Sequence, residues 1–282
     1  MEQLLQNLLN KKILLIVAAV LCAALLIGTF IMTAFSPAPE PPPETTVATE
    51  STTSFVPETN PYGPEDFTSV GDQIICITDD AATGIDVSQH QGQIDWQQVA
   101  DSGVEFVIIR VGGRGWGQAG TLYTDDLAQD YYTGAKAVGL KIGAYFFSQA
   151  TTAEEAREEA RFALAQTKNW ELELPIAFDW EYIGPEARTA NMDQDTLTEC
   201  VLAFCGEIES AGKETMLYTN PHHAGVGLDL EALDGMNIWL AMYSEEMTYP
   251  YYITAWQYSC TGTVPGIEGD VDINLYFGLE KA

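Results

Sequence analysis

Two carboxylates, Asp179 and Glu181, follow directly on the apolar run 174–178, which has the composition of a buried β-strand. Side chains alternate across a strand, so these acids point to one face with Cα atoms about 6.6 Å apart, while Trp180 points to the other. Two acids held this close cannot both ionise freely, and separated carboxyl pKa values are what general acid catalysis at a glycosidic bond requires. The pair alone also fits an exposed strand end with solvated acids.

Further elements must position such a pair. Thr152 and Glu155 form a capping box that predicts the start of a helix, and the apolar spacing over 197–208 predicts another. Strands and helices alternate in the first part of the domain, and strands crowd together at its end. This order predicts an α/β barrel whose ring of helices is incomplete. Its eight strand-like runs are 84–87, 106–109, 142–147, 174–178, 216–218, 238–241, 253–256 and 271–273.

The mouth of this barrel is where we expect the chemistry, because catalytic groups lie at the C-terminal ends of barrel strands. Asp86 closes the first predicted strand, Asp179 and Glu181 the fourth, and Asp272 the eighth. Strands one and eight are neighbours in a closed barrel, so Asp86 and Asp272 should meet. Sugars bind well to such an acidic cleft when aromatic rings wall it, since their apolar faces stack on rings. The predicted wall is Tyr145, Tyr218, Trp239 and Trp256.

Several motifs in this order resemble those of family 25 glycoside hydrolases, the N-acetylmuramidases of bacteria and phages. The resemblance covers about residues 83–278, and it weakens over 244–252, at the predicted rim of the groove. The motifs are Gly84 to Gly92 with Ile94-Asp95-Trp96, Gly139 to Phe146, Pro175 to Glu181, Leu217 to Asn220, Trp239-Leu240-Ala241, Trp256 to Ser259 and Val264 to Asn274.

The resemblance implies a fold and a set of roles. The fold is a TIM-like barrel of five β/α units followed by three strands, (β/α)5(β)3, and the reaction is cleavage of the β-1,4 bond between N-acetylmuramic acid and N-acetylglucosamine in peptidoglycan. Glu181 matches the general acid, and Asp179 matches the carboxylate that orients the substrate acetamido group or stabilises positive charge. Asp86 and Asp272 are supporting acids in the cleft. Two alternatives remain: a catalytically silent cell-wall-binding module, and a glycosidase of this fold acting on another extracellular polysaccharide.

The N-terminus predicts a membrane anchor. Lys11 and Lys12 precede residues 13–35, an uncharged stretch of 23 residues that spans about 35 Å as a helix. The positive-inside rule then leaves residues 1–12 in the cytoplasm and the rest outside, in a single-pass cell-membrane topology. Residues 36–71, rich in Pro, Thr and Glu, predict a disordered linker, and residues 72–282 the extracellular barrel. A cleaved secretory signal is the alternative.

Charge, cysteines and histidines limit the other possibilities. The chain carries a net charge of −29, which opposes binding to nucleic acid. Cys200 and Cys205 are either buried thiols or members of disulfides with Cys76 or Cys260, and oligomeric state is not readable. Neither a cofactor nor a metal is predicted: no Cys/His spacing fits zinc, and the adjacent His222-His223 cannot easily chelate one ion. Arg110 could pair with a cleft acid or form a structural salt bridge.

Overall fold

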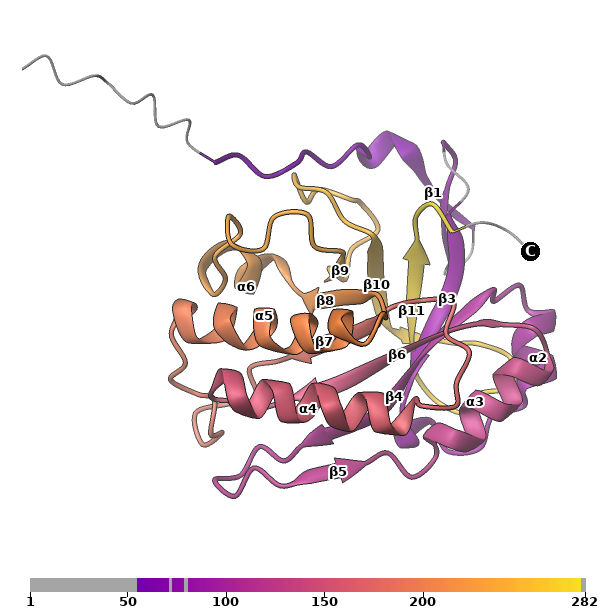
Figure 1. Cartoon of the computed structure of the whole chain (residues 1–282). Coiled ribbons are helices and arrows are strands. Elements are labelled where there is room, and N and C mark those ends of the chain that lie inside the picture. Colours follow the sequence, from indigo (N-terminus) through magenta and orange to yellow (C-terminus); the bar gives the residue numbers. More distant parts are fainter. Residues whose placement is uncertain (1–54, 71–72, 79–80, 280–282) are drawn as a thin grey trace, which may run out of the picture. The chain divides into compact units, whose positions relative to one another are not determined.

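The computed structural model describes residues 55–70, 73–78 and 81–279 (Figure 1). The predicted cytoplasmic tail, the span 13–35 and the linker up to residue 54 lie outside the described residues. Within the described ranges, no helix is long and apolar enough to cross a membrane. These described residues all belong to one compact unit.

Eight strands close into a barrel, and each overlaps one of the eight runs predicted from the sequence. Around the ring the order is β3, β4, β6, β7, β8, β9, β10 and β11, and β11 pairs again with β3. A short strand, β5 (Leu122–Thr124), pairs with β4 outside the ring. The strands are β3 (Ala82–Val87), β4 (Phe106–Arg114), β6 (Lys141–Ser148), β7 (Ile176–Trp180), β8 (Thr215–Thr219), β9 (Ile238–Ala241), β10 (Ala255–Gly262) and β11 (Val271–Tyr276).

Five helices follow the first five barrel strands, one after each. They are α2 (Trp96–Asp101), α3 (Ala128–Ala137), α4 (Ala153–Gln166), α5 (Gln194–Ser210) and α6 (Pro221–Val226), while the connections 242–254 and 263–270 contain no helix. The predicted (β/α)5(β)3 order and the incomplete helical ring are therefore confirmed. Figure 1 shows α4 and α5 side by side along one flank, where Arg161 of α4 pairs with Glu207 of α5.

Helix α4 starts where the capping box predicted. The hydroxyl of Thr152 accepts a hydrogen bond from the backbone N–H of Glu155 at 3.2 Å. The carboxylate of Glu155 reaches back to the N–H of Thr151, one residue earlier than a standard capping box would place it, at 2.8 Å. Three alanines on one side of the helix, Ala156, Ala160 and Ala163, are fully buried against the barrel.

Successive side chains along each strand point alternately into two apolar layers. Inward side chains form a core inside the ring that includes Phe106, Ala177, Met216, Trp239 and Tyr276. The intervening residues face outward and form the larger core beneath the helices. The barrel interior is therefore a packed core and not a pore.

One predicted position needs correction. The sequence analysis placed Asp272 at the C-terminal end of a parallel strand, but it lies second in β11, which runs antiparallel to both neighbours. The physical reason is the short connection from β10 to β11, residues 263–270, because a parallel crossover needs a dozen residues or more. The reversed direction brings the start of β11 to the mouth, and Asp272 is the register partner of Asp86. The expected meeting of these two acids is confirmed.

The folded unit also starts earlier than expected. Residues 55–70, assigned above to the linker, pack on the barrel, and β1 (Phe67–Val70) forms an antiparallel hairpin with β2 (Gln73–Cys76) after the 3-10 turn η1 (Pro64–Asp66). The Phe67 ring lies edge-on to Trp256 at 5.2 Å, and Tyr62 stacks on Phe277 at 4.5 Å. Composition hid this segment, because a few aromatic residues supply the apolar surface that its prolines and threonines lack.

Candidate active site

The four predicted acids meet at the mouth of the barrel. Asp86 on β3 and Asp179 on β7 share the inward face with the barrel core and are almost completely buried. Glu181 is exposed immediately after β7, and Asp272 is partly exposed. Each of these acids acts electrostatically on at least one of the others. The cluster joins residues from the first, fourth and eighth strands of the ring.

Asp86 is held by two amide side chains. Gln257 Nε2 and Asn274 Nδ2 both donate to its Oδ2, at 2.8 and 2.9 Å. Burial and the charge of Asp272 nevertheless raise the pKa of Asp86 well above its usual value, and the two hydrogen bonds only partly oppose this. An acid in this position holds a proton to higher pH than a surface aspartate does.

Asp179 resembles Asp86 in its burial and its raised pKa, but its hydrogen bonding is incomplete. Burial, followed by the charges of Glu181 and Asp86, raises its pKa well above the usual value, while Arg110 works in the opposite direction. Its Oδ1 is buried and receives no hydrogen bond from any described residue. Because buried acceptors are nearly always paired in folded proteins, this atom is suited to receive a donor from a bound molecule.

The pKa values of the other two acids, Glu181 and Asp272, are raised as well. Desolvation raises the pKa of Glu181 even though its side chain reaches solvent. Desolvation, with the charges of Glu181 and Asp270, raises the pKa of Asp272 to about 6. Close carboxyls whose protons leave at higher pH than usual can supply a general acid near neutral pH.

Three of the four predicted aromatic residues lie beneath the acids. Tyr218 donates its hydroxyl proton to Gln257 Oε1 at 2.8 Å, and Trp239 Nε1 donates to Asn274 Oδ1 at 2.8 Å. Tyr145 and Tyr218 both pack edge-on to Trp239, with ring centroids 6.1 and 4.7 Å away. Since Trp239 is only 1% exposed, these rings lie inside the barrel, where Tyr218 and Trp239 orient the amides that hold Asp86.

The fourth predicted aromatic residue, Trp256, does not lie with the acids. Its ring is fully buried on the outer face of β10, under Phe67, and its Nε1 donates to the carbonyl of Met242. Alternation along the strand explains the error, because Gln257 is the residue that points inward. Trp180 is also an outward residue, as its place in the strand predicted, and it packs edge-on to His223 at 5.1 Å in the outer core.

Exposed rings at the mouth come from positions that the sequence analysis did not single out. Tyr243, Tyr182 and Trp116 follow β9, β7 and β4 and are each more than half exposed. The Tyr243 hydroxyl donates to Gln257 Oε1 at 3.0 Å, which holds this ring next to the amide that binds Asp86. Only the position of each residue after a parallel strand could have identified it.

Arg110 forms a salt bridge, and the structure identifies the partner that the sequence did not. Its Nε lies 2.8 Å from Oδ2 of Asp125, which also accepts the backbone N–H of Gln89 at 3.0 Å. Its partner is therefore a loop acid, but Arg110 is still close enough to lower the pKa of Asp179. Asp125 carried no motif, and Gln257 and Asn274 lay in matched motifs without an assigned role, so none of the three was predicted as a site residue.

The sequence model described as glycosyl hydrolases family 25 matches residues 85–267, well over half of the chain. The chain belongs to this family. The match contains Asp86, Asp179 and Glu181. It ends before Asp272, so in this family 25 chain only the structure brings Asp272 to the other three acids.

Three known proteins show the extent of the similarity. The autolytic lysozyme of Clostridium acetobutylicum is 30% identical over 195 residues, which are 68% of this chain and 55% of that protein. The modular autolysin LytC of Streptococcus pneumoniae, solved alone and with a synthetic peptidoglycan ligand, superimposes with a TM-score of 0.63 at 26% identity, over 75% of this chain and 52% of LytC. The Streptomyces coelicolor lysozyme superimposes with a TM-score of 0.58 at 26% identity, over 70% of this chain and 92% of that lysozyme. The chain spans about half the length of the first two.

The histidines and the cysteines of this family 25 domain were also considered in the sequence analysis. The described residues contain no group of three or more His, Cys, Asp or Glu side chains placed to hold a metal ion. His222 and His223 donate their backbone N–H groups to the side chain of Asn220, which caps α6. Cys76, Cys200 and Cys205 are buried free thiols, and Cys260 is an exposed one.

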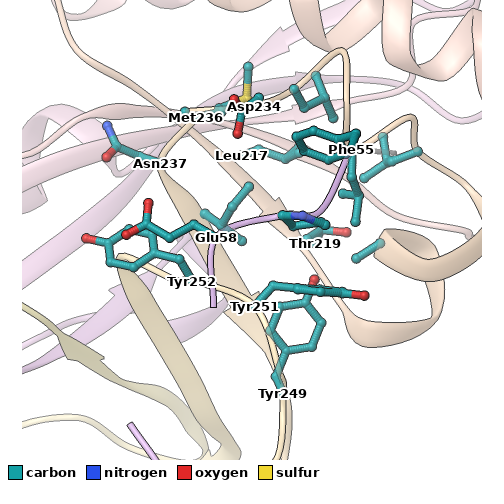
Figure 2. A pocket seen from close by; sticks show the side chains of 17 residues that line it. Phe55, Glu58, Leu217, Thr219, Asp234, Met236, Asn237, Tyr249, Tyr251 and Tyr252 are labelled. Carbon is teal, nitrogen blue, oxygen red and sulfur yellow. The ribbon is translucent and has the colours of Figure 1, made fainter. Parts of the chain in front are cut away.

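A separate cavity of about 130 Å³ lies outside the barrel (Figure 2). Its lining includes Phe55 and Glu58 of the N-terminal segment, Leu217 and Thr219 of β8, and Tyr251, all labelled in Figure 2. None of the four acids lines it. Leu217 belongs to the outward layer of the barrel, so this cavity is a gap where the helical ring is incomplete.

Proposed function

We propose that this chain is a peptidoglycan hydrolase, an N-acetylmuramidase that cleaves the β-1,4 bond between N-acetylmuramic acid and N-acetylglucosamine. The observation that carries the proposal is the pair Asp179 and Glu181 at the end of β7, within a cluster of four acids, in a chain of family 25. Its similarity to lysozymes and to LytC, which has been solved with a peptidoglycan ligand, supports this substrate class.

In the proposed mechanism, Glu181 is the general acid. Its carboxyl group stands at the mouth, where a glycan can reach it, and desolvation holds its proton to higher pH than usual. The proton goes to the glycosidic oxygen as the bond to the anomeric carbon breaks. Asp272, whose pKa of about 6 leaves it ionised at neutral pH, favours positive charge developing on the sugar ring, and Asp86 lies beside it as its register partner.

Asp179 acts on the acetamido group of the muramic acid ring. The unpaired Oδ1 of Asp179 accepts the acetamido N–H, and this orients the carbonyl oxygen for attack on the anomeric carbon. The cyclic intermediate then opens when water, deprotonated by Glu181, attacks the same carbon. The product retains its configuration, and no covalent bond to the enzyme forms. A first-formed α anomer in NMR would rule out this mechanism while leaving the substrate assignment intact.

Two alternatives are distinguished by one experiment. Purified peptidoglycan is digested, its new reducing ends are reduced with borohydride, and the fragments are weighed by mass spectrometry. Muramic acid at the reduced end supports the proposal. Intact glycan that still retains the protein points to a silent wall-binding module, and cleavage of another polysaccharide alone points to a different specificity.

Two matched variants test the general acid. Glu181→Gln keeps the shape of the side chain but cannot donate a proton, so turnover should fall about 10²–10⁴-fold with folding unchanged. Glu186→Gln changes the same residue type in the same exposed loop and should leave turnover unchanged. A Glu181→Gln variant within about threefold of wild type would remove the residue from this role.

We also propose that residues 13–35 anchor the enzyme in the cell membrane, with residues 1–12 in the cytoplasm and the catalytic unit outside. The uncharged stretch after Lys11 and Lys12 supports this orientation. Protease added to intact cells should release an active fragment. A catalytic unit that is protected until the cells are lysed would contradict the orientation, and full release into the medium without protease would indicate a cleaved signal.

A further inference from the structure

Glu181 lies just beyond the support of the sheet. The last register pair between β6 and β7 is Ser148 with Trp180, and the last between β7 and β8 is Asp179 with Tyr218. The carboxylate of Glu181 receives no side-chain hydrogen bond from the described residues and reaches solvent. A general acid needs a fixed position, so the constraint on Glu181 must come from its backbone.

Gln149 supplies that constraint. This residue follows β6 directly, is completely buried, and donates from Nε2 to the carbonyl of Glu181 at 3.2 Å and to the carbonyl of Ser148 at 2.9 Å. Its Oε1 accepts the hydroxyl proton of Thr189 at 2.8 Å. Two carbonyls can only accept, so the amide nitrogen must face them, and the amide has a single orientation.

The backbone of Gln149 is itself fixed from two sides. Its carbonyl accepts from Arg188 Nη1 at 3.1 Å, and Arg188 Nη2 donates to Glu155 of α4 at 2.7 Å. Its N–H donates to Glu159 of α4 at 3.4 Å, and Glu159 is paired with Arg114 at 2.7 Å. Helix α4 thus anchors the end of β6 that contacts Glu181.

The same network ties down the loop that follows Glu181. Arg188 donates its backbone N–H to the carbonyl of Trp116 at 2.9 Å, and Thr189 is buried against Gln149. The loop is therefore fixed at residues 188 and 189, and the Glu181 carbonyl is fixed by Gln149. The peptide plane after Glu181 and the strand before it together set the direction in which the Glu181 side chain leaves the backbone.

We propose that Gln149 is the positioning residue of the general acid: its amide fixes the peptide plane of Glu181, and Thr189 fixes the amide. The inference rests on the proposed function, since it assumes that Glu181 donates the proton. It assigns a catalytic consequence to a buried residue that touches no substrate. A displacement of about 1 Å at a reacting group can reduce turnover by about 10²-fold, which sets the size of the effect to look for.

Kinetics of the full chain with four variants test the proposal. Gln149→Leu should lower kcat about 10- to 100-fold with KM within about twofold, because orientation is lost while the glycan contacts remain. Thr189→Val should also lower kcat, but by a smaller factor than Gln149→Leu. Thr189→Ser, which keeps the hydroxyl, should have the kcat of wild type. Gln149→Glu should regain activity as pH falls, because only the protonated carboxyl can donate to the Glu181 carbonyl.

A matched control separates positioning from stability. Thr167→Val also removes a buried hydrogen bond, from its hydroxyl to the carbonyl of Ala163, but at the far end of α4. It should lower the unfolding midpoint while leaving kcat per folded molecule unchanged. If Gln149→Leu loses only stability, if its loss falls on KM, or if kcat stays within about threefold of wild type, the inference is wrong.

A second readout does not depend on the substrate. Carbon-13 NMR of the Glu181 carboxyl follows its pKa directly, and Gln149→Leu and Thr189→Val should both move that pKa, unlike Thr167→Val. If wild type fails to cut peptidoglycan, the proposed function fails, and this titration still decides the positioning role. If wild type cuts and neither kinetics nor titration responds to Gln149, only the positioning inference fails.

Discussion

Replacing Asp272 with asparagine should stabilise the protein at neutral and alkaline pH. In the folded chain Asp272 is the register partner of Asp86, and like charges directly across a strand pair are destabilising. Desolvation and the neighbouring charges of Glu181 and Asp270 raise its pKa from 3.8 to about 6. Asparagine keeps the shape of the side chain and carries no charge at any pH in this range.

The direction of this pKa shift determines whether ionisation of Asp272 stabilises or destabilises the folded chain. The folded chain holds the Asp272 proton more tightly than the unfolded chain does, so ionisation costs folding free energy as pH rises from about 4 to about 6. A shift of about two pKa units, at about 1.4 kcal/mol each, gives an upper limit of about 3 kcal/mol. Partial exposure screens the charge, so we expect Asp272→Asn to gain about 1–3 kcal/mol above about pH 7 and nothing below about pH 4.

Urea unfolding at several pH values measures this difference. Glu268→Gln is the matched control, because Glu268 is exposed in the same connection, does not act on the pKa of Asp272, and its replacement changes the net charge equally. That variant should stay within about 0.5 kcal/mol of wild type. A gain of equal size at all pH values, a loss of stability in Asp272→Asn above about pH 7, or an equal gain in Glu268→Gln would refute the reasoning.

Two further predictions concern the N-terminal segment and the thiols. Phe67→Ala should destabilise the protein by about 2–4 kcal/mol, because the ring covers Trp256, whereas Val70→Ala, on the exposed part of the same strand, should have little effect in thermal or urea unfolding. Equal effects would mean that the segment does not support the barrel. Iodoacetamide under native conditions should label Cys260 and spare Cys76, Cys200 and Cys205, as read by peptide mass mapping; early labelling of a buried thiol, or disulfide-linked peptides among these four, would contradict the described state.

The ring of strands and the meeting of the acids were predictable because both depend on local pattern. Apolar runs fix the strands, and the order of strands and helices fixes which neighbours close the barrel. Asp179 and Glu181 could be assigned to one face from their spacing alone. The position of Asp86 next to Asp272 followed from closure, although the predicted strand direction was wrong.

The remaining errors arose where one residue decides the face or where a loop supplies the partner. Trp256 and Gln257 are adjacent, and the sequence does not say which of them points inward until the register with β11 is known. Asp125 and Gln149 act through single hydrogen bonds between distant segments, and no spacing rule encodes such contacts. The residues that hold the acids were therefore harder to predict than the acids themselves.

The reversed strand β11 also decides where the barrel begins and ends. Tyr276, its last residue, is the register partner of Ala82, the first residue of β3. In a ring of eight parallel strands these ends would lie on opposite rims, separated by a strand of six residues or about 20 Å. Here entry and exit adjoin at the base, opposite the acids. The ring can therefore be spliced into longer chains, or circularly permuted, without any added segment crossing the mouth.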